Sequence, residues 1–193
     1  MLATETFKSC MNKLTKLVRR VIGKVLGKRT WQEIEHFDPS WSLRIKEMAK
    51  HIREGESVLD LGCGKMWLRQ FLPNNVYYPV DYTDRGNGSI VCNFNQKQFP
   101  QNSADIAFVS GTLEYIIDAQ WFVSCIGQKC SRCVISYCLL EDYPDLDFRR
   151  ERAWVNDFSR DDIIRMFSAE GFQLASEDYA IPKNRIFYFV KSV

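Results

Sequence analysis

A short apolar run that ends in a glycine turn is the feature that most constrains this chain. Residues 57–64 read Ser-Val-Leu-Asp-Leu-Gly-Cys-Gly. The valine and the leucines suit an inner strand of a parallel sheet, because such a strand is buried on both faces. Gly62 and Gly64 carry no Cβ, so the backbone there can turn sharply and approach a ligand closely. The pattern predicts a buried strand that leads, past Asp60, into a ligand-binding turn.

The residues after this turn distinguish between kinds of nucleotide site. Residues 65–71 contain no helix breaker and predict a helix that begins at the turn, an order typical of phosphate or ribose recognition. A dinucleotide-binding fingerprint has a further glycine three residues after the second glycine of its pair, and Trp67 stands at that position. We therefore do not expect a nicotinamide cofactor.

Later segments follow at the intervals of a repeating strand-helix-strand unit. Residues 76–80 predict a second strand that ends on Asp81, about twenty residues after the first turn, where such folds place a carboxylate on ribose hydroxyls. Residues 90–92 predict a short third strand, and Asn93 follows it. The second and third strands are thus expected to end, like the first, at polar side chains.

The rest of the chain predicts helices, strands and a closing hairpin. A fourth strand lies within residues 99–115. Ser159 suits the N-cap of a late helix, and Gly171 suits the position just after its end. The remaining expected elements are helices over 41–52, 118–128 and 159–170, a strand over 132–138, and a hairpin formed by 172–179 and 185–191.

The motif Asp60-x-Gly62-x-Gly64 resembles the first motif of the class I S-adenosylmethionine-dependent methyltransferases. The later segments follow the order of that family over roughly residues 55 to 190. The resemblance implies an α/β, three-layer Rossmann-like fold with a mostly parallel seven-stranded sheet and an antiparallel last strand. It also implies a methyltransferase domain over residues 31–193 and S-adenosylmethionine as the cofactor.

The resemblance further implies which residues bind the cofactor. In the family, the first acidic residue and the glycine backbone hold the amino-acid and ribose parts, and a polar residue after the third strand bonds the adenine amino group. Many members have Asp at the position of Asn93 and a third glycine at that of Met66. The cofactor-binding residues implied here are Asp60, Gly62, Cys63, Gly64, Asp81, Tyr82, Asn93 and Ser110.

The acceptor side of such a site lies in the loops after the fourth and fifth strands. Methyl transfer depends mostly on alignment, but a hydroxyl or amine acceptor also needs a base. Glu114 and Tyr115 follow the fourth strand and are the expected catalytic residues, although both also suit a helix start and a core aromatic. The charged stretch 141–152 fits recognition of a polar, sugar-like acceptor, a lid, or a solvated loop of local ion pairs. Trp154 and Asn156 are candidate residues of the acceptor pocket.

Seven cysteines are an odd number, spread over predicted strands, helices and the turn, and do not suggest a disulfide framework. Those at positions 125, 130, 133 and 138 could in principle hold zinc. Residues 132–137, however, predict a strand whose side chains alternate between opposite faces. We therefore expect buried free cysteines and no metal site.

Charge is distributed unevenly along the chain. Residues 1–30 hold eight Lys or Arg and one acid, a net charge of +7, whereas the other residues have a net charge of −5. Apolar residues within 7–26 recur at three- and four-residue steps, so the segment predicts a basic amphipathic helix. Such a helix either binds an anionic membrane surface or packs on the domain. The acidic remainder argues against nucleic acid as a partner.

The sequence therefore predicts an S-adenosylmethionine-dependent methyltransferase acting on a small-molecule or glycan-like acceptor, free or presented at a membrane surface. The alternative is a non-catalytic membrane-surface binding module built on the methyltransferase fold. No apolar run reaches the roughly twenty residues that cross a bilayer, and residues 1–30 lack the apolar core of a signal peptide. A cytoplasmic, reducing location is the expectation.

Overall fold

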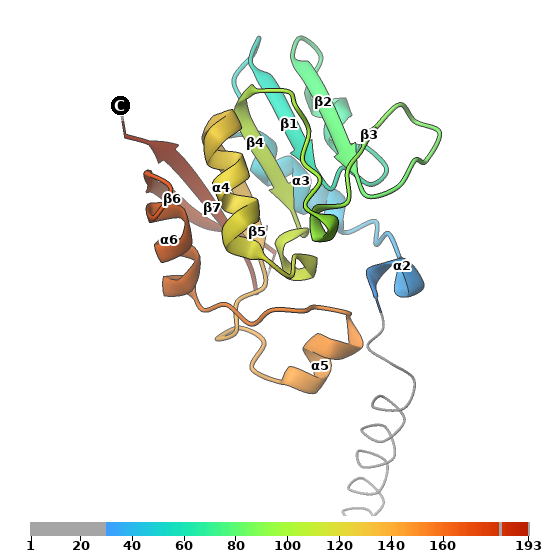
Figure 1. The fold of residues 1–193 in the computed structure, drawn as a ribbon, viewed down its shortest axis with the longest axis vertical. Helices are drawn as coiled ribbons and strands as arrows, with labels where there is room; N and C mark the ends of the chain where they lie inside the picture. The colour runs from blue at the N-terminus through green and yellow to red at the C-terminus, as the bar shows by residue number, and fades with distance from the viewer. Residues whose placement is uncertain (1–29, 182, 193) are drawn as a thin grey trace, which may run out of the picture.

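A seven-stranded sheet with the strand order β3-β2-β1-β4-β5-β7-β6 forms the centre of the molecule (Figure 1). The computed structural model describes residues 30–181 and 183–192. Strands β1 to β5 pair in parallel, and β7 runs antiparallel to both of its neighbours, so the predicted sheet is confirmed. The strands are β1 (Ser57–Leu61), β2 (Val76–Asp81), β3 (Ile90–Val91), β4 (Ala104–Ser110), β5 (Cys130–Tyr137), β6 (Phe172–Ile181) and β7 (Asn184–Lys191).

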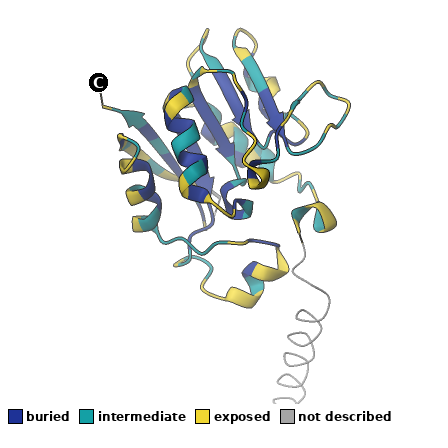
Figure 2. Cartoon of the chain, in the orientation of Figure 1, coloured by how far each residue is buried: buried dark blue, intermediate teal, exposed yellow. Residues whose placement is uncertain are grey.

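Helices lie on both faces of this sheet and make three layers (Figure 1). Alternate residues of β4 face opposite ways: Ile106 packs in a cluster with Met48 of α3, and Ala107 packs in a cluster with Phe122 of α4 and Phe167 of α6. Burial concentrates in the strands and on the sides of α4 and α6 that face them (Figure 2). The helices are α2 (Trp31–Ile34), α3 (Trp41–Ala49), α4 (Ala119–Lys129), α5 (Leu146–Glu151) and α6 (Arg160–Ser168).

The local start and stop signals act as the sequence predicts. The Ser159 side chain caps α6 by accepting a hydrogen bond from Asp162 N, and the Asp162 carboxylate accepts one from Ser159 N at 2.9 Å. Gly171 follows α6 with a φ of +79°, a conformation that favours glycine. The hairpin of β6 and β7 closes the sheet. Among the described helices, none is both long and apolar enough to span a membrane.

The helix predicted over 65–71 is wrong. The chain forms only a 3-10 segment there, η1 (Trp67–Phe71), and Met66 before it adopts a left-handed conformation with a φ of 56°. Pro73 follows shortly after and prevents an α-helix from continuing. The glycine turn therefore has no α-helix N-terminus behind it. Two other 3-10 segments are η2 (Phe94–Gln96) and η3 (Leu113–Tyr115).

Candidate functional site

Polar residues line the carboxyl edge of the sheet. The parallel strands β1 to β5 all end at this edge, and the antiparallel β7 begins there, because Tyr137 near the end of β5 pairs with Arg185. In open α/β sheets, ligands bind at this edge, where the strand order reverses. Here the reversal falls between β1 and β4. The residues that meet along the edge are Asn93, Asp81, Gly62 to Gly64, Ser110, Glu114, Cys138 and Asn184.

The glycine turn after β1 is tied closely to β2. Gly62 N and Cys63 N both donate to Val80 O, at 2.8 and 2.9 Å. Gly62 has a φ of +92°, and a Cβ added to it would lie 2.2 Å from the Oγ1 of Thr112. Gly64 N donates to Asp81 Oδ2 at 2.8 Å. The turn therefore requires glycine and joins two of the predicted cofactor-binding segments.

Asp60 is buried beneath this turn, with 4% of its surface exposed. Tyr77, on the neighbouring strand, donates a hydrogen bond to its Oδ2 at 2.5 Å. Burial raises the pKa of Asp60, the Tyr77 hydrogen bond opposes the increase and the charge of Asp81 adds to it, so that the pKa is about 7. The sequence offers no sign of Tyr77, because its partnership with Asp60 depends on the pairing of β1 with β2.

Asp81 is also buried, and Arg85 lies beside it. Its Oδ1 lies 3.3 Å from Arg85, and Arg85 in turn pairs with Glu35. The guanidinium of Arg85 lies 5.4 Å from the ring of the half-buried Tyr82. Arg85 and Glu35 are residues that sequence reasoning missed, because the loop after β2 gives no periodic signal.

Asn93 and Ser110 lie at the same edge on opposite sides of the turn. The Asn93 side chain accepts a hydrogen bond from Asn95 N at 3.1 Å and so caps η2. Ser110 Oγ accepts a hydrogen bond from the Nε of Arg44 at 2.9 Å. The predicted cofactor residues are thus brought to one edge, each already engaged with its own neighbours.

Arg44 is the most informative residue that the sequence did not identify. It lies on α3, has 7% of its surface exposed, and its guanidinium packs so closely on Gly111 that an added Cβ would lie 2.7 Å from Nη2. Within the described residues, its Nη1 and Nη2 make no hydrogen bond. Burial lowers the Arg44 pKa, and the charge of Glu114 opposes this effect. A buried guanidinium with donors to spare suits an anionic group of a ligand.

Glu114 and Tyr115, the predicted catalytic residues, lie in η3 after β4. Glu114 is 2% exposed, and its Oε1 accepts a hydrogen bond from Cys138 N at 3.1 Å. Burial raises its pKa, and the charges of Arg44 and Arg149 oppose the increase. Tyr115 accepts a hydrogen bond from Trp154 Nε1 at 3.2 Å. Burial also raises the pKa of Tyr115, so its phenol stays neutral and is no base at pH 7.

Residues 31–41 form an aromatic segment over the glycine turn. The ring of Phe37 contacts Gly64, where an added Cβ would lie 2.6 Å from Cε1 of the ring. Phe37 also lies 6.2 Å, between ring centroids, from both Trp41 and Trp67. Trp31 packs on Tyr115 at 4.8 Å. The segment therefore covers the turn and reaches Tyr115, on the side of the edge where the sequence predicts the acceptor.

The charged stretch after β5 is more ordered than a solvated loop. Arg149 of α5 is fully buried and donates to Cys138 O at 2.9 Å and to Tyr137 OH at 3.0 Å. Its Nε pairs with Asp157 at 2.7 Å. Asn156 donates through Nδ2 to the backbone oxygen atoms of η3 and of the residue after it. This network holds the segment against the carboxyl edge.

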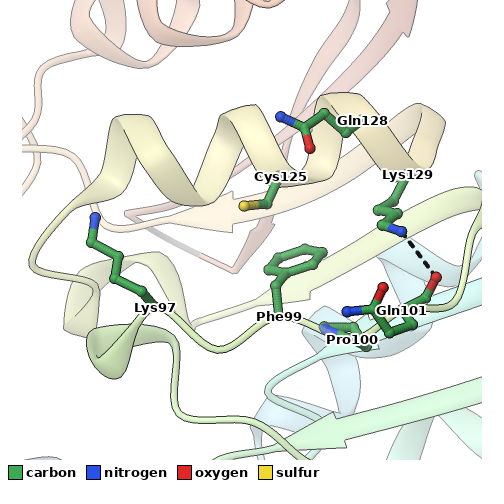
Figure 3. Close-up of a pocket in the computed structure, with 7 residues that line it drawn as sticks. All are labelled: Lys97, Phe99, Pro100, Gln101, Cys125, Gln128 and Lys129. Atoms are coloured by element: carbon green, nitrogen blue, oxygen red, sulfur yellow. Dashed lines mark hydrogen bonds between the residues drawn. The ribbon is translucent and has the colours of Figure 1, made fainter.

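A surface cavity lies away from this arrangement of polar groups, whereas Cys63 and Cys138 belong to it. Within residues 30–181 and 183–192, no cluster of three or more His, Cys, Asp or Glu side chains is placed to hold a metal ion. The surface cavity, of about 300 Å³, lies between α4 and the segment before β4, and Phe99 and Cys125 are among the residues that line it (Figure 3). Lys129 Nζ donates to Gln101 O across it at 2.9 Å. This cavity is not at the carboxyl edge.

The polar groups of the edge match those of S-adenosylmethionine in kind. Two buried carboxylates, Asp60 and Asp81, can accept hydrogen bonds from hydroxyl or ammonium groups, and the guanidinium of Arg44 can bind a carboxylate. Gly62 and Gly64 leave no room for a Cβ against Thr112 and Phe37. The residues present therefore fit the cofactor that the resemblance implies.

A protein-family model described as "Methyltransferase domain" matches residues 33–177. A search of curated protein sequences found no match. The chain is similar in structure to magnesium protoporphyrin IX methyltransferase from Synechocystis PCC 6803 with bound SAM. That likeness has a TM-score of 0.62 and 14% identity, and it covers 92% of this chain and 97% of that one.

Two further solved structures are similar. One is the complex between the Haloferax volcanii Trm112 methyltransferase activator and a methyltransferase, with a TM-score of 0.63, 16% identity, and coverage of 80% of this chain and 91% of that one. The other is CalO1, a methyltransferase in calicheamicin biosynthesis, in its SAH-bound form. Its TM-score is 0.60 at 14% identity, with coverage of 79% of this chain and 54% of that one.

Proposed function

We propose a small-molecule acceptor for this chain, which belongs to the methyltransferase-domain family and is an S-adenosylmethionine-dependent methyltransferase of class I. One observation carries the proposal. The polar groups along the carboxyl edge divide at β4 into two sets, one on the side of β1 to β3 and one on the side of β5 and β7. The first set suits the cofactor, and the second suits an acceptor.

The first set would hold the cofactor, which supplies an activated methyl group on a sulfonium. Asp81 would accept hydrogen bonds from the ribose hydroxyls. The backbone of Gly62 to Gly64, supported by Asp60 beneath it, would lie along the amino-acid part, whose carboxylate suits Arg44. Asn93 would bond the adenine amino group. Cys63, Tyr82 and Ser110 would complete the surroundings of the cofactor.

The second set would act on the acceptor. Glu114 is the candidate base, because it has a carboxylate oxygen that no described residue engages. Tyr115 keeps its proton and would orient the acceptor as a hydrogen-bond donor. Alignment of the acceptor with the methyl group contributes most of the acceleration, and a positioned base adds a further factor.

Burial favours a small or slender acceptor. Glu114 is only 2% exposed, and its backbone oxygen accepts a hydrogen bond from Val155 N in the segment after α5, so a bulky folded partner cannot reach its side chain. Structurally similar proteins include a calicheamicin-biosynthesis methyltransferase, a pyocyanin biosynthetic protein and a magnesium protoporphyrin IX methyltransferase. These similarities support a small-molecule acceptor for the present chain.

We extend the proposal to a glycan-like acceptor, presented at an anionic membrane surface in the cytoplasm. Residues 1–30, with a net charge of +7, would attach the protein to that surface. Residues 1–29 lie outside the described residues, and the attachment remains a prediction.

Calorimetric titration with S-adenosylmethionine and S-adenosylhomocysteine tests the proposal. We expect saturable binding, and we expect Asp81→Ala to weaken it by about tenfold or more, because a hydrogen bond to a charged group contributes about 1.5–3 kcal/mol. Asp105→Ala is the matched control, since its carboxylate bonds Ser57 at the opposite edge of the sheet. Equal losses in the two variants would contradict the site assignment. Binding of neither ligand would favour the non-catalytic membrane module.

A further inference from the structure

Two buried side chains at the carboxyl edge each have an oxygen that no described residue engages. They are Glu114 Oε2 and Asn184 Oδ1, on residues that are 2% and 3% exposed. Buried polar atoms are nearly always hydrogen-bonded, and leaving one unsatisfied costs about 1–3 kcal/mol. Both atoms are hydrogen-bond acceptors, so what they lack is a donor. A ligand with two donors would satisfy both.

Both side chains are anchored on the same residue. Glu114 Oε1 accepts a hydrogen bond from Cys138 N at 3.1 Å, and Asn184 Nδ2 donates to Cys138 Sγ at 3.2 Å. Cys138 itself is held by Arg149, which donates to its carbonyl oxygen at 2.9 Å. Because both side chains bond Cys138, they lie beside each other and form one candidate site. That site lies on the opposite side of β4 from the predicted cofactor residues.

The charges around this site determine which kind of hydrogen-bond donor an acceptor molecule can present there. Arg44 and Arg149 are buried and carry positive charges that act on Glu114. Arg149 shares the single carboxylate of Asp157 with Arg150. Beside Glu114 itself, two buried guanidinium groups outnumber the single carboxylate, and they disfavour an ammonium group there. An acceptor carboxylate has no proton to donate to either oxygen. A neutral hydroxyl is the remaining common acceptor, and two hydroxyls match two oxygens.

We propose that Glu114 and Asn184 recognise a neutral acceptor with at least two hydroxyl groups, one on each oxygen, and that the hydroxyl on Glu114 is the one methylated. This inference rests on the proposed function. The hydroxyl oxygen forms a bond to the methyl carbon, and the carbon–sulfur bond breaks with its electron pair on the sulfur, which becomes a neutral thioether. The hydroxyl proton passes to Glu114 Oε2. The products are a methyl ether and a protonated Glu114.

The test uses the full chain, labelled S-adenosylmethionine and acceptors that share one sugar ring: a methyl glucoside, its amino-sugar analogue and its uronic acid, with phenol and catechol as flat counterparts. We expect transfer to the neutral polyhydroxyl compounds, with catechol preferred to phenol. Glu114→Gln should lower kcat by about 100-fold or more and remove the acid limb of the pH–rate profile. Asn184→Ala should instead raise the KM for the acceptor by about tenfold.

Glu54→Gln is the matched control, because Glu54 is exposed and bonds Asn74 at the other edge of the sheet. Calorimetry on each variant measures cofactor affinity separately. A wild-type chain that binds no cofactor contradicts the proposed function itself. A chain that binds it but methylates only the amine or the acid, or no hydroxyl at all, overturns the present inference alone. Full activity of the Glu114→Gln variant also overturns the inference. If that variant does not fold, an unchanged KM for the acceptor in Asn184→Ala overturns the inference instead.

Discussion

The glycine turn is the residue-scale feature with the least tolerance for change. Gly62→Ala places a Cβ 2.2 Å from Thr112 Oγ1 at a φ of +92°, and we expect it to lower the free energy of unfolding by about 2 kcal/mol or more. Gly55→Ala is the matched control, because Gly55 has a φ of +79° with nothing within 4 Å. It should cost about 1 kcal/mol, the strain alone. Urea unfolding compares the two, and equal costs would contradict the steric argument.

Asp60 makes stability depend on pH. Its folded pKa of about 7 exceeds the unfolded value of about 3.9, so the folded state binds the proton more tightly. Its contribution to stability is fully present below about pH 4 and is lost as pH rises through about 7. We therefore expect Asp60→Asn to gain stability relative to the wild type between pH 5 and pH 8, by at most about 4 kcal/mol.

Urea unfolding at intervals across this range measures the difference. Asp105→Asn serves as the control, because hydrogen bonds from Ser57 lower the pKa of Asp105. Its contribution is lost only as pH falls through that lowered value, so its difference from the wild type should stay constant from pH 5 to pH 8. A constant difference for Asp60→Asn would show that Asp60 does not titrate in this range.

Single residues that follow strand ends were predictable, and their partners were not. Asp60, Asp81 and Glu114 lie at the carboxyl edge of the sheet because each is at or just after the end of a parallel strand. Arg44 and Asn184 reach the same edge from α3 and β7, and only the packing of the sheet brings them there. No spacing along the sequence encodes such contacts.

At the scale of elements, the capped helix α6 gives a direct test. Ser159→Ala removes the side-chain cap and the reciprocal pairing with Asp162, and should lower the free energy of unfolding by about 1 kcal/mol. Ser168→Ala, at the exposed C-terminal end of the same helix, should change it by a few tenths at most. Thermal unfolding of both variants measures the difference. Similar losses would mean that the cap is not formed.

Elements with strong local signals were predicted well. The strands, α3, α4 and α6 follow apolar periodicity, caps and stops. The segment after the glycine turn was mispredicted, because nothing in residues 65–71 signals the left-handed Met66 that precedes η1. The short α5 was missed because its anchor, the buried Arg149, resembles a surface charge in the sequence.

At the scale of the whole molecule, the charge of residues 1–30 predicts binding to anionic lipid. The full chain should float with phosphatidylserine vesicles at low salt and less so at high salt, because screening weakens attraction between exposed charges. A full-length variant with Lys13, Lys16, Arg20 and Lys24 changed to Gln should stay in solution. Flotation of both chains, or of neither, would contradict the prediction.

The connections from β1 to β2 and from β2 to β3 contain no α-helix, and β3 pairs with β2 through only two residues. Segments with so little packing open most often, so the amide hydrogens of β2 and β3 should exchange with solvent sooner than those of β5. Asp81 and Asn93 belong to this weakly supported side. A ligand that binds these residues only in their folded arrangement stabilises that arrangement against opening. If the methyl donor binds Asp81 and Asn93 as proposed, it also supports the structure, and we expect β2 and β3 to open more often when it is scarce.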